Sequence, residues 1–454
     1  MGTFLLPREP VRSIDEWLAT DAGGTGLERA VALGPAATRD LVLRSGLRGR
    51  GGGGFPTGRK WASIATSGTG DRYVVCNAAE GEPGTFKDRA LMRANPYQLV
   101  EGVVIAAFAV GARRAYICLK EKFAEERERV TSAVAEMQDA GICADCEITV
   151  VAGPEEYLFG EEKAMLEVVE GRSPLPRLFP PHEQGLFATA SVSGWEGSSA
   201  PAGDVSNPTL VNNCETLSNV PWILACGPEW FRKRGTAESP GTIVTTVVGD
   251  VVAPDVGEVE LGVSLGDVID AVGSGVAPGR SVKAVLSGVA NEVMTDAMLA
   301  SPVTYEGIPM GAAGFIVLDD TACMVQAAMN CSRFLYVESC GQCPPCKRGS
   351  GEITQRLERI EAGVGTEADV NEIARWLQRV TDGNRCYLAV EERAVVTSIL
   401  QAFADEVAEH VSTGRCPHPR KLPMWSLLDL RDGVATYDES FWRKRPDWTY
   451  EPES

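Results

Sequence analysis

Short apolar runs alternate with longer amphipathic segments in the first half of the chain. Three of these runs, 73–76 (YVVC), 115–119 (AYICL) and 147–151 (EITVV), have the length and composition of buried strands. Segments 97–111 and 121–138, which lie between them, have the length and apolar spacing of helices. Because strand, helix and strand in succession build parallel sheets, this part of the chain is predicted to be an α/β domain.

A hairpin followed by a helix is predicted next. GTIVTTVVGDV and GEVELG alternate like two strands joined by a turn, and LGDVIDAV follows with helical spacing. Residues 241–318 are therefore expected to form a small α+β domain.

Apolar residues at helical spacing dominate the region after residue 318. Apolar residues recur at helical intervals in 324–336, 353–360, 370–377 and 396–407, which predicts four helices packed as a bundle. The tail beyond them is rich in Pro and Trp and shows little periodicity, so it is expected to wrap over a neighbouring surface.

These patterns divide the chain into four segments. The boundaries are 1–240, 241–318, 319–412 and a tail at 413–454. Within the first segment, residues 188–206 are rich in Gly, Ser, Ala and Pro, which predicts a flexible insertion or a lid.

Composition narrows the classes of function. Lys and Arg number 43 against 62 Asp and Glu, so the net charge is −19 and a nucleic-acid partner is not expected. The longest apolar run, 103–112, is too short to cross a bilayer, so direct membrane insertion is not expected either. Thirteen cysteines, an odd number spread unevenly, favour reduced thiols or metal ligation over disulfides and hence a cytoplasmic protein.

A cysteine triplet carries the clearest chemical signal. Cys340, Cys343 and Cys346 have C-x2-C-x2-C spacing in a loop of Gly and Pro, and Cys386 follows between two predicted helices. Four thiolates can hold an iron–sulfur cubane, and the turn residues let three sulfurs converge. A structural zinc is the alternative, but zinc ribbons use paired C-x2-C knuckles.

The other cysteines give weaker signals. Cys143 and Cys146 form a C-x2-C pair without further ligands nearby, which favours two plain thiols over a redox or metal site. Cys416 supports no interpretation. Apolar neighbours favour core filling for the rest, which are Cys76, Cys118, Cys214, Cys226, Cys323 and Cys331.

Two loops suit a polar cofactor. Residues 47–60 concentrate glycines beside basic residues, so backbone N–H groups can approach a phosphate or a flat ring while Lys60 or Arg50 supplies countercharge. A flexible hinge is the alternative. Residues 77–88 carry an amide and, at positions 80 and 82, two carboxylates next to turn residues at the carboxyl end of the strand 73–76, where parallel sheets bind ligands. A solvated acidic loop is the alternative there.

Five segments together resemble a known family. They are GRGGGGFPTGRKW, CNAAEGEPGTFKDR, EEYLFGEEKAMLE, TLVNNCETLSNVP and ESCGQCPPCKRG, in this order. The combination resembles the NADH-binding flavoprotein subunit of respiratory complex I, which has relatives in NAD-linked hydrogenases and formate dehydrogenases. The resemblance implies an α/β plus α fold class: a Rossmann-like FMN domain, a ubiquitin-like β-grasp domain and a C-terminal four-helix bundle carrying a [4Fe–4S] cluster.

The resemblance also implies site residues. Phe55 and Glu82 match positions that contact NAD(H), and Glu80 and Glu82 are the carboxylates assigned to the reaction centre. The cluster ligands would be Cys340, Cys343, Cys346 and Cys386. The positions matching the FMN site are Gly49, Arg50, Gly51, Gly52, Lys60, Asn77, Glu80, Tyr157, Gly160, Glu161, Glu162, Asn212, Asn213 and Thr216.

Four positions depart from the family pattern. Ala79 replaces an Asp of the flavin loop, and Phe179 replaces a Lys. Ser63 and His182 stand where an aromatic pair is expected to sandwich the adenine. Aromatic stacking of a base contributes about 1–3 kcal/mol per ring, so the dinucleotide pocket is expected to be remodelled.

The function implied is NADH dehydrogenase (quinone)-type electron transfer. NADH gives up two electrons as a hydride, clusters accept one at a time, and a flavin mediates between them. Two alternatives remain: an adapter that uses another donor or acceptor, and a nonenzymatic scaffold with a decayed pocket. The resemblance further implies two partners, a thioredoxin-like [2Fe–2S] subunit and a larger iron–sulfur subunit, which would place the chain at the inner face of a membrane.

Overall fold

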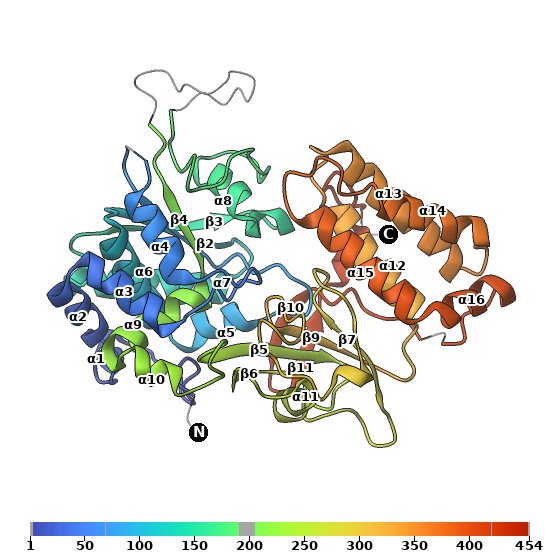
Figure 1. The fold of residues 1–454 in the computed structure, drawn as a ribbon, viewed down its shortest axis with the longest axis horizontal. Helices are drawn as coiled ribbons and strands as arrows, with labels where there is room; N and C mark the ends of the chain where they lie inside the picture. Colours follow the sequence, from blue (N-terminus) through green and yellow to red (C-terminus); the bar gives the residue numbers. More distant parts are fainter. Residues whose placement is uncertain (1–2, 69, 190–204, 419, 453–454) are drawn as a thin grey trace.

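The computed structural model describes residues 3–68, 70–189, 205–418 and 420–452. Figure 1 shows the first part of the chain on one side, two further sheets at the centre and the helices α12 to α16 on the other side. Most of the insertion predicted at 188–206 lies outside the described residues.

A set of helices without any counterpart in the sequence-based prediction precedes the first strand. Two of them are fixed by Glu101, a buried carboxylate that accepts hydrogen bonds from Trp17 Nε1 at 2.8 Å and from the Gly24 amide at 2.9 Å. The helices are α1 (Ile14–Leu18), α2 (Thr25–Leu33), α3 (Pro35–Ser45) and α4 (Thr57–Thr66).

A four-stranded parallel sheet forms the centre of the first region. Its strands are β1 (Tyr73–Asn77), β2 (Arg114–Lys120), β3 (Glu147–Gly153) and β4 (Thr209–Asn213), in the order β3-β2-β1-β4. The three strands predicted from apolar runs are confirmed. Because β2 and β4 flank β1 on opposite sides, the chain reverses its winding beside β1, where open α/β sheets bind ligands.

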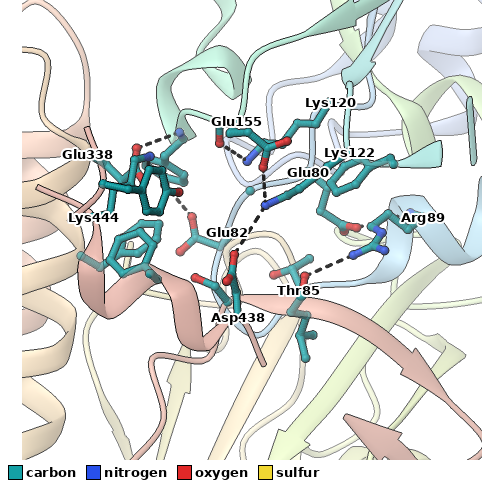
Figure 2. Close-up of a pocket in the computed structure, with 18 residues that line it drawn as sticks. Glu80, Glu82, Thr85, Arg89, Lys120, Lys122, Glu155, Glu338, Asp438 and Lys444 are labelled. Atoms are coloured by element: carbon teal, nitrogen blue, oxygen red, sulfur yellow. Dashed lines mark hydrogen bonds and ion pairs between the residues drawn. The ribbon is translucent and has the colours of Figure 1, made fainter. Parts of the chain in front are cut away.

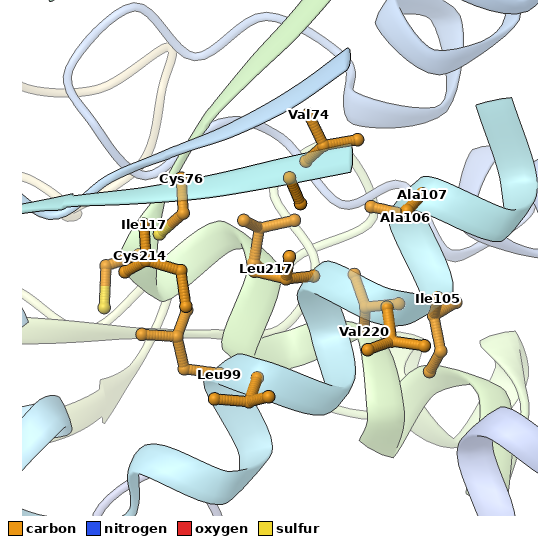
Figure 3. Packing of buried hydrophobic residues seen from close by; sticks show 14 of the residues in the cluster. Val74, Cys76, Leu99, Ile105, Ala106, Ala107, Ile117, Cys214, Leu217 and Val220 are labelled. Carbon is orange, nitrogen blue, oxygen red and sulfur yellow. The ribbon is translucent and has the colours of Figure 1, made fainter. Parts of the chain in front are cut away.

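Apolar helices cover this sheet. In Figure 3, strand residues Val74 and Ile117 lie in the same buried hydrophobic cluster as Leu99 of α6 and Leu217 of α9. The two helices can approach closely because Gly102 has no side chain. A Cβ atom at this position would lie 2.1 Å from the Leu217 carbonyl oxygen. The helices after β1 in this region are α5 (Lys87–Ala94), α6 (Pro96–Val110), α7 (Ala124–Asp139), η1 (Tyr157–Gly160), α8 (Glu162–Val169), α9 (Cys214–Cys226) and α10 (Pro228–Arg232).

The second sheet is mixed and five-stranded, in the order β6-β5-β9-β7-β8. Its first two strands form the predicted antiparallel hairpin, the predicted helix α11 follows them, and β9 pairs parallel to β5. The elements are β5 (Thr242–Gly249), β6 (Asp255–Glu260), α11 (Leu265–Gly273), β7 (Val282–Ser287), β8 (Met294–Thr295), η2 (Asp296–Met298) and β9 (Gly314–Asp319).

The C-terminal region holds five helices among the described residues, so the prediction of four is wrong. The apolar spacing at 396–407 is divided between two helices, because Phe403 leaves the helical conformation with φ −121° and ψ 37°. Neither Gly nor Pro marks this break in the sequence. The helices are α12 (Met324–Glu338), α13 (Pro344–Glu361), α14 (Glu367–Leu377), α15 (Leu388–Ala402) and α16 (Ala404–Thr413).

The tail runs back over the first two regions. The Gly84 amide donates to the Trp425 carbonyl at 2.8 Å, and Arg420 pairs with Asp250 at 2.6 Å. Its elements are β10 (Leu427–Arg431), β11 (Val434–Tyr437) and η3 (Glu439–Arg443). Among the described residues, no helix is both long enough and apolar enough to cross a membrane.

Candidate flavin and iron–sulfur site

A cavity of about 600 Å³ opens at the carboxyl ends of the parallel strands. Its volume lies within the range of about 300–1,000 Å³ typical of small-molecule sites. Asn77 ends β1, Asn213 ends β4, and η1 follows β3, so the sheet itself delivers these polar groups to one place. The cavity therefore stands where the strand pattern predicted a cofactor.

Many of the residues implied by the family resemblance line this cavity. They come from the glycine loop, the acidic loop, η1 and the end of β4. They are Gly51, Gly52, Asn77, Glu80, Glu82, Tyr157, Gly160, Glu161 and Asn213.

Arg50 and Thr216 lie behind the cavity wall instead of in it. The Arg50 amide donates to Thr216 Oγ1 at 2.9 Å, and the buried guanidinium donates to the Thr242 carbonyl at 2.9 Å. Its Nη1 also donates to the Tyr305 hydroxyl, which in turn donates to the Gly49 carbonyl at 3.1 Å. These contacts tie the glycine loop to the second sheet.

Lys60, Phe55 and Asn212 also lie outside the cavity lining. Lys60 pairs with Glu162 at 3.0 Å, and Asn212 Oδ1 accepts from the buried Trp61 indole at 2.8 Å. Phe55 is 57% exposed. In this conformation Asn212 acts on the framework, while Lys60 and Phe55 stay at the surface.

The glycine loop presents bare backbone to the cavity. A side chain at Gly53 would meet nothing within 4 Å, and Gly52 has a φ of +105°, which disfavours any other residue. The amides of residues 51–53 make no hydrogen bond to any part of the chain that the structure describes. Free N–H groups of this kind suit a phosphate or the polar edge of a ring, so the loop fits a flavin.

Lys87 supplies a buried positive charge at the floor of the cavity. Its Nζ lies 2.7 Å from Asp88 Oδ1, 2.9 Å from Glu215 Oε2 and 3.2 Å from Asn213 Oδ1. Burial lowers the pKa of Lys87, but the charges of Asp88, Glu215 and Glu80 outweigh it, so the pKa lies above its ordinary value. The ammonium is therefore held charged.

Glu80 and Glu161 are carboxylates at the starts of two helices. Glu80 accepts from the Asp88 and Arg89 amides at the first turn of α5, and Glu161 caps α8 through the Ala164 amide at 2.9 Å. Burial, followed by the charge of Asp88, raises the pKa of Glu80 to about 7. Burial also raises the pKa of Glu161 to about 7.

Tyr157 lies between two further carboxylates. Its hydroxyl donates to Glu82 Oε2 at 2.6 Å and lies 3.4 Å from Glu391 Oε2. The Val289 amide donates to the other oxygen of Glu82 at 2.6 Å. Burial raises the pKa of both Glu82 and Glu391, so protons are retained here at a higher pH than on exposed carboxyls.

One polar atom of the lining has no partner. Thr85 Oγ1 is buried and makes no hydrogen bond in the part of the chain that the structure describes. This atom lies against Gly314 of the second sheet, where a Cβ would be 2.2 Å from it, so it is not aimed into the cavity.

The remaining lining residues were not singled out from the sequence. Lys87 and Asp88 lie in the acidic loop, which the sequence did indicate as a whole. Residues 290–291 and 311–312 come from the loops of the second sheet, where no motif marks them; the complete set is Gly53, Gly81, Thr85, Lys87, Asp88, Leu158, Ala290, Asn291, Gly311, Ala312, Tyr387, Leu388 and Glu391.

A second, small cavity is lined by all four cysteines of the predicted cluster site, Cys340, Cys343, Cys346 and Cys386. The Arg385 amide donates to Cys343 Sγ at 3.3 Å, the kind of bond that cluster sulfurs accept. Burial raises the pKa of the Cys386 thiol to about 12. Four thiols around one buried space fit an iron–sulfur cluster, whose charge would hold them as thiolates.

The two cavities share a wall. Cys386, Leu158 and Leu388 line both of them. A group in the large cavity and a cluster bound by the cysteines would therefore be separated by side chains of one layer.

A third, strongly polar cavity lies on the far side of the acidic loop (Figure 2). Lys120 lies in it and donates to the Glu155 carbonyl at 3.0 Å; burial, followed by the charge of Lys122, lowers its pKa to about 8. Lys444 from the tail pairs with Glu338 at 2.7 Å on the opposite wall. The tail thus closes the space behind the acidic loop.

Two regions of the chain match known sequence families. Residues 42–222 match the Nuo51 FMN-binding domain, and residues 326–410 match the NADH-ubiquinone oxidoreductase-F iron-sulfur binding region. The second match contains all four cysteines of the small cavity. Fold and site thus define a flavin- and iron–sulfur-containing redox protein, and the predicted FMN domain and [4Fe–4S] region are confirmed.

The chain belongs to the family of F subunits of NADH-quinone oxidoreductase. It is 37% identical over 421 residues to the Streptomyces coelicolor member of this family, and the match covers 89% of this chain and 90% of the relative. NADP-reducing hydrogenase subunit HndC of Solidesulfovibrio fructosivorans is 34% identical, with 89% and 82% covered. A crystal structure of NAD⁺-reducing [NiFe]-hydrogenase in the H₂-reduced state is similar with a TM-score of 0.75 at 30% identity; the match covers 91% of this chain and 66% of that chain.

Proposed function

We propose that this chain oxidises NADH at an FMN held in the large cavity and passes electrons singly to a [4Fe–4S] cluster held by the four cysteines. Bound FMN would supply the chemistry, because a flavin accepts a hydride and returns its two electrons one at a time. The observation that supports this proposal is the wall shared by the two cavities. Of the described residues, only Cys386, Leu158 and Leu388 line both cavities, so the proposed electron donor and acceptor would lie on either side of one layer of side chains.

The chain's own residues would hold and orient the cofactor. The free amides of residues 51–53 suit its polar edges, and Lys87 supplies a fixed positive charge beneath it. Asn77 and Asn213 lie at neighbouring strand ends, where their amides can fix its orientation. Phe55, exposed beside the glycine loop, and Glu82, inside the cavity, are proposed to meet the nicotinamide nucleotide.

Lys60, Arg50, Thr216 and Asn212 would act through the framework of the site. Arg50 and Thr216 fix the glycine loop, and Asn212 fixes Trp61 behind β4. Lys60 and its partner Glu162 are only half-buried, so Lys60 is free to exchange this ion pair for a phosphate.

Domain boundaries and partners follow the same proposal. We place an FMN domain at 1–240, a β-grasp domain at 241–318, a helical cluster domain at 319–412 and a tail at 413–454. The described chain contains one site of four cysteines, at the small cavity, so electrons leave through other subunits. We propose a thioredoxin-like [2Fe–2S] subunit and a larger iron–sulfur subunit, in a cytoplasmic complex at the inner face of a membrane.

Anaerobic reduction of the bound flavin tests the proposal. The purified full chain, reconstituted with FMN, iron and sulfide, is expected to lose its flavin absorption when NADH is added. Cys343→Ser is expected to lose the cluster but keep the bleaching, whereas Cys226→Ser, which changes a cysteine remote from both cavities, keeps both. If neither NADH nor NADPH bleaches the flavin, the dehydrogenase function is wrong.

A different electron donor is the second candidate. Ser63 and His182, which replace the aromatic pair expected to sandwich adenine, are both exposed, and Ser63 offers no ring for stacking. The relative HndC is named as a subunit of an NADP-reducing enzyme. The same bleaching experiment with NADPH and with reduced ferredoxin separates these donors, since only the true donor reduces the flavin in a single fast phase.

A further inference from the structure

Three metal-ligating side chains meet at a place remote from the four predicted cluster cysteines. The ligand atoms of Cys323, His410 and Cys416 all lie within 4.8 Å of one another. Cys323 precedes α12, His410 lies in the last turn of α16, and Cys416 lies just after that helix. The chain thus brings Cys323 together with two donors that lie 87 residues or more further along the sequence.

The histidine is oriented as a metal ligand requires. His410 Nδ1 lies 2.8 Å from the Glu406 carbonyl oxygen, which can only accept, so Nδ1 carries the hydrogen. Nε2 then presents its lone pair, and it lies 3.4 Å from Cys323 Sγ. Fixing the tautomer through a carbonyl on the far nitrogen is the usual support of a metal-bound imidazole.

Burial separates this group from ordinary surface thiols. Cys323 is fully buried and His410 is 1% exposed, while Cys416 is half-buried at the edge of the group. Cys323 Sγ accepts from the Gln326 amide at 3.3 Å, and Cys416 Sγ donates to the His418 carbonyl at 3.0 Å. Both sulfurs are therefore positioned by backbone contacts beside the imidazole.

We propose that Cys323, His410 and Cys416 bind a zinc ion. Two thiolates and one imidazole form the soft donor set that zinc prefers over Mg²⁺ or Ca²⁺. Three protein ligands leave a fourth position of the tetrahedron for a water or another side chain. This site goes beyond the proposed function, because it lies outside the linings of both the large and the small cavity.

The ion would join the start of the tail to the start of α12. Cys416 opens the tail that later covers the polar cavity behind the acidic loop, and Cys323 immediately precedes α12. A metal at this place would fix where the tail leaves α16. The plain alternatives are three packed side chains without a metal, or a disulfide between Cys323 and Cys416.

Metal analysis of the full chain with its FMN and cluster reconstituted tests the proposal. Elemental analysis is expected to give one zinc per chain in addition to the cluster iron. Cys416→Ser and His410→Gln are each expected to reduce zinc at least tenfold while flavin and iron stay constant. The control Cys343→Ser should show the reverse pattern, with iron lost and zinc kept, and Cys226→Ser should lose neither metal.

X-ray absorption at the zinc edge gives a second measurement that needs no variant. We expect two sulfur neighbours at about 2.3 Å and a nitrogen at about 2.0 Å. A wild-type chain that takes up no zinc, or a Cys323–Cys416 disulfide in unreduced peptide maps, would overturn the proposal. Retention of zinc in the triple variant Cys323→Ser/His410→Gln/Cys416→Ser would overturn it as well.

Discussion

At the scale of single residues, the large cavity is dominated by carboxylates with raised pKa values. Glu80, Glu82, Glu161 and Glu391 all line it, and burial is the first cause in each case. Lys87 is the opposing charge, and it is already paired with Asp88 and Glu215. The lining therefore gains negative charge as pH rises through the neutral range, which affects any anionic ligand bound there.

Tyr157 lowers the pKa of one of these carboxylates, Glu82, through a direct hydrogen bond. Its hydroxyl stabilises the charged form of Glu82, so we expect Tyr157→Phe to raise the pKa of Glu82 further. A lost hydrogen bond to a charged group costs about 1.5–3 kcal/mol, which corresponds to about one to two pH units. The pH profile of flavin reduction by NADH, measured by stopped flow, should move upward accordingly. Tyr387→Phe, at an exposed tyrosine of the same cavity, should leave the profile in place.

Substitutions of the buried Lys87 and of the partly exposed Lys122 are expected to differ strongly in their effect on stability. Lys87→Met would remove the buried countercharge of Asp88 and leave Glu215 with only the more distant Arg50, at 3.8 Å, and removing one partner of a buried pair costs about 3–5 kcal/mol. We expect a clear fall in melting temperature together with loss of FMN. Lys122→Met removes a partly exposed pair with Glu155 and should cost less than about 1 kcal/mol. Equal effects of the two substitutions would contradict this assignment of Lys87.

At the scale of helices and strands, apolar periodicity found the elements that are buried evenly along their length. The strand β1 is the clearest example, because it is a short apolar run whose first four residues are all buried. The break between α15 and α16 could not be found this way, since Val396, Leu400 and Val407 keep a helical spacing across Phe403. The helix α15 ends because Phe403 adopts a non-helical conformation. The residue type at this position does not predict a helix end.

Glu392 on α15 makes the stability of the helical region depend on pH. It is fully buried, it accepts from Ser332 Oγ at 2.6 Å, and burial raises its pKa to about 8. The folded state therefore binds a proton that the unfolded chain has released, and its stability falls as pH rises from about 4.5 to 8. The difference between a pKa of 4.5 and one of about 8 corresponds to a contribution on the order of 5 kcal/mol.

We expect Glu392→Gln to remove this part of the pH dependence. The variant should match or exceed the wild type in melting temperature at pH 8.5, and the two should differ least near pH 5, where Glu392 is protonated in the folded state. Glu372→Gln, at an exposed pair on α14, is the matched control and should leave the wild-type pH slope intact. A wild-type slope in Glu392→Gln would show that Glu392 ionises with an ordinary pKa in the folded state and does not cause the pH dependence.

At the scale of the whole molecule, the site is assembled from regions that the sequence shows separately. The glycine and acidic loops could be assigned to a cofactor because their residue types have that chemistry and follow predicted elements. Residues 290–291 and 311–312 could not, because only the docking of the second sheet brings them to the cavity. The zinc ligands are a similar case, since Cys323 resembles core filling and Cys416 has no local motif.

The tail reaches the large cavity through one buried ion pair. Lys444 Nζ lies 2.7 Å from Glu338 Oε1, and Glu338 Oε2 accepts from the Tyr157 amide at 3.0 Å. Both charged side chains are about 3% exposed. A residue of the tail is thus linked, through the end of α12, to the tyrosine that lies between Glu82 and Glu391.

Removing Lys444 should therefore disturb a cavity that it does not line. Lys444→Met leaves Glu338 buried without its countercharge, so we expect a loss of about 3–5 kcal/mol and weaker FMN binding as Tyr157 shifts. The double variant Glu338→Gln/Lys444→Met removes the stranded charge while keeping an acceptor for the Tyr157 amide, so it should recover most of both losses. Melting curves and quenching of FMN fluorescence measure the two effects. A double variant as unstable as Lys444→Met would mean that the tail acts through packing of its apolar residues and not through this charge.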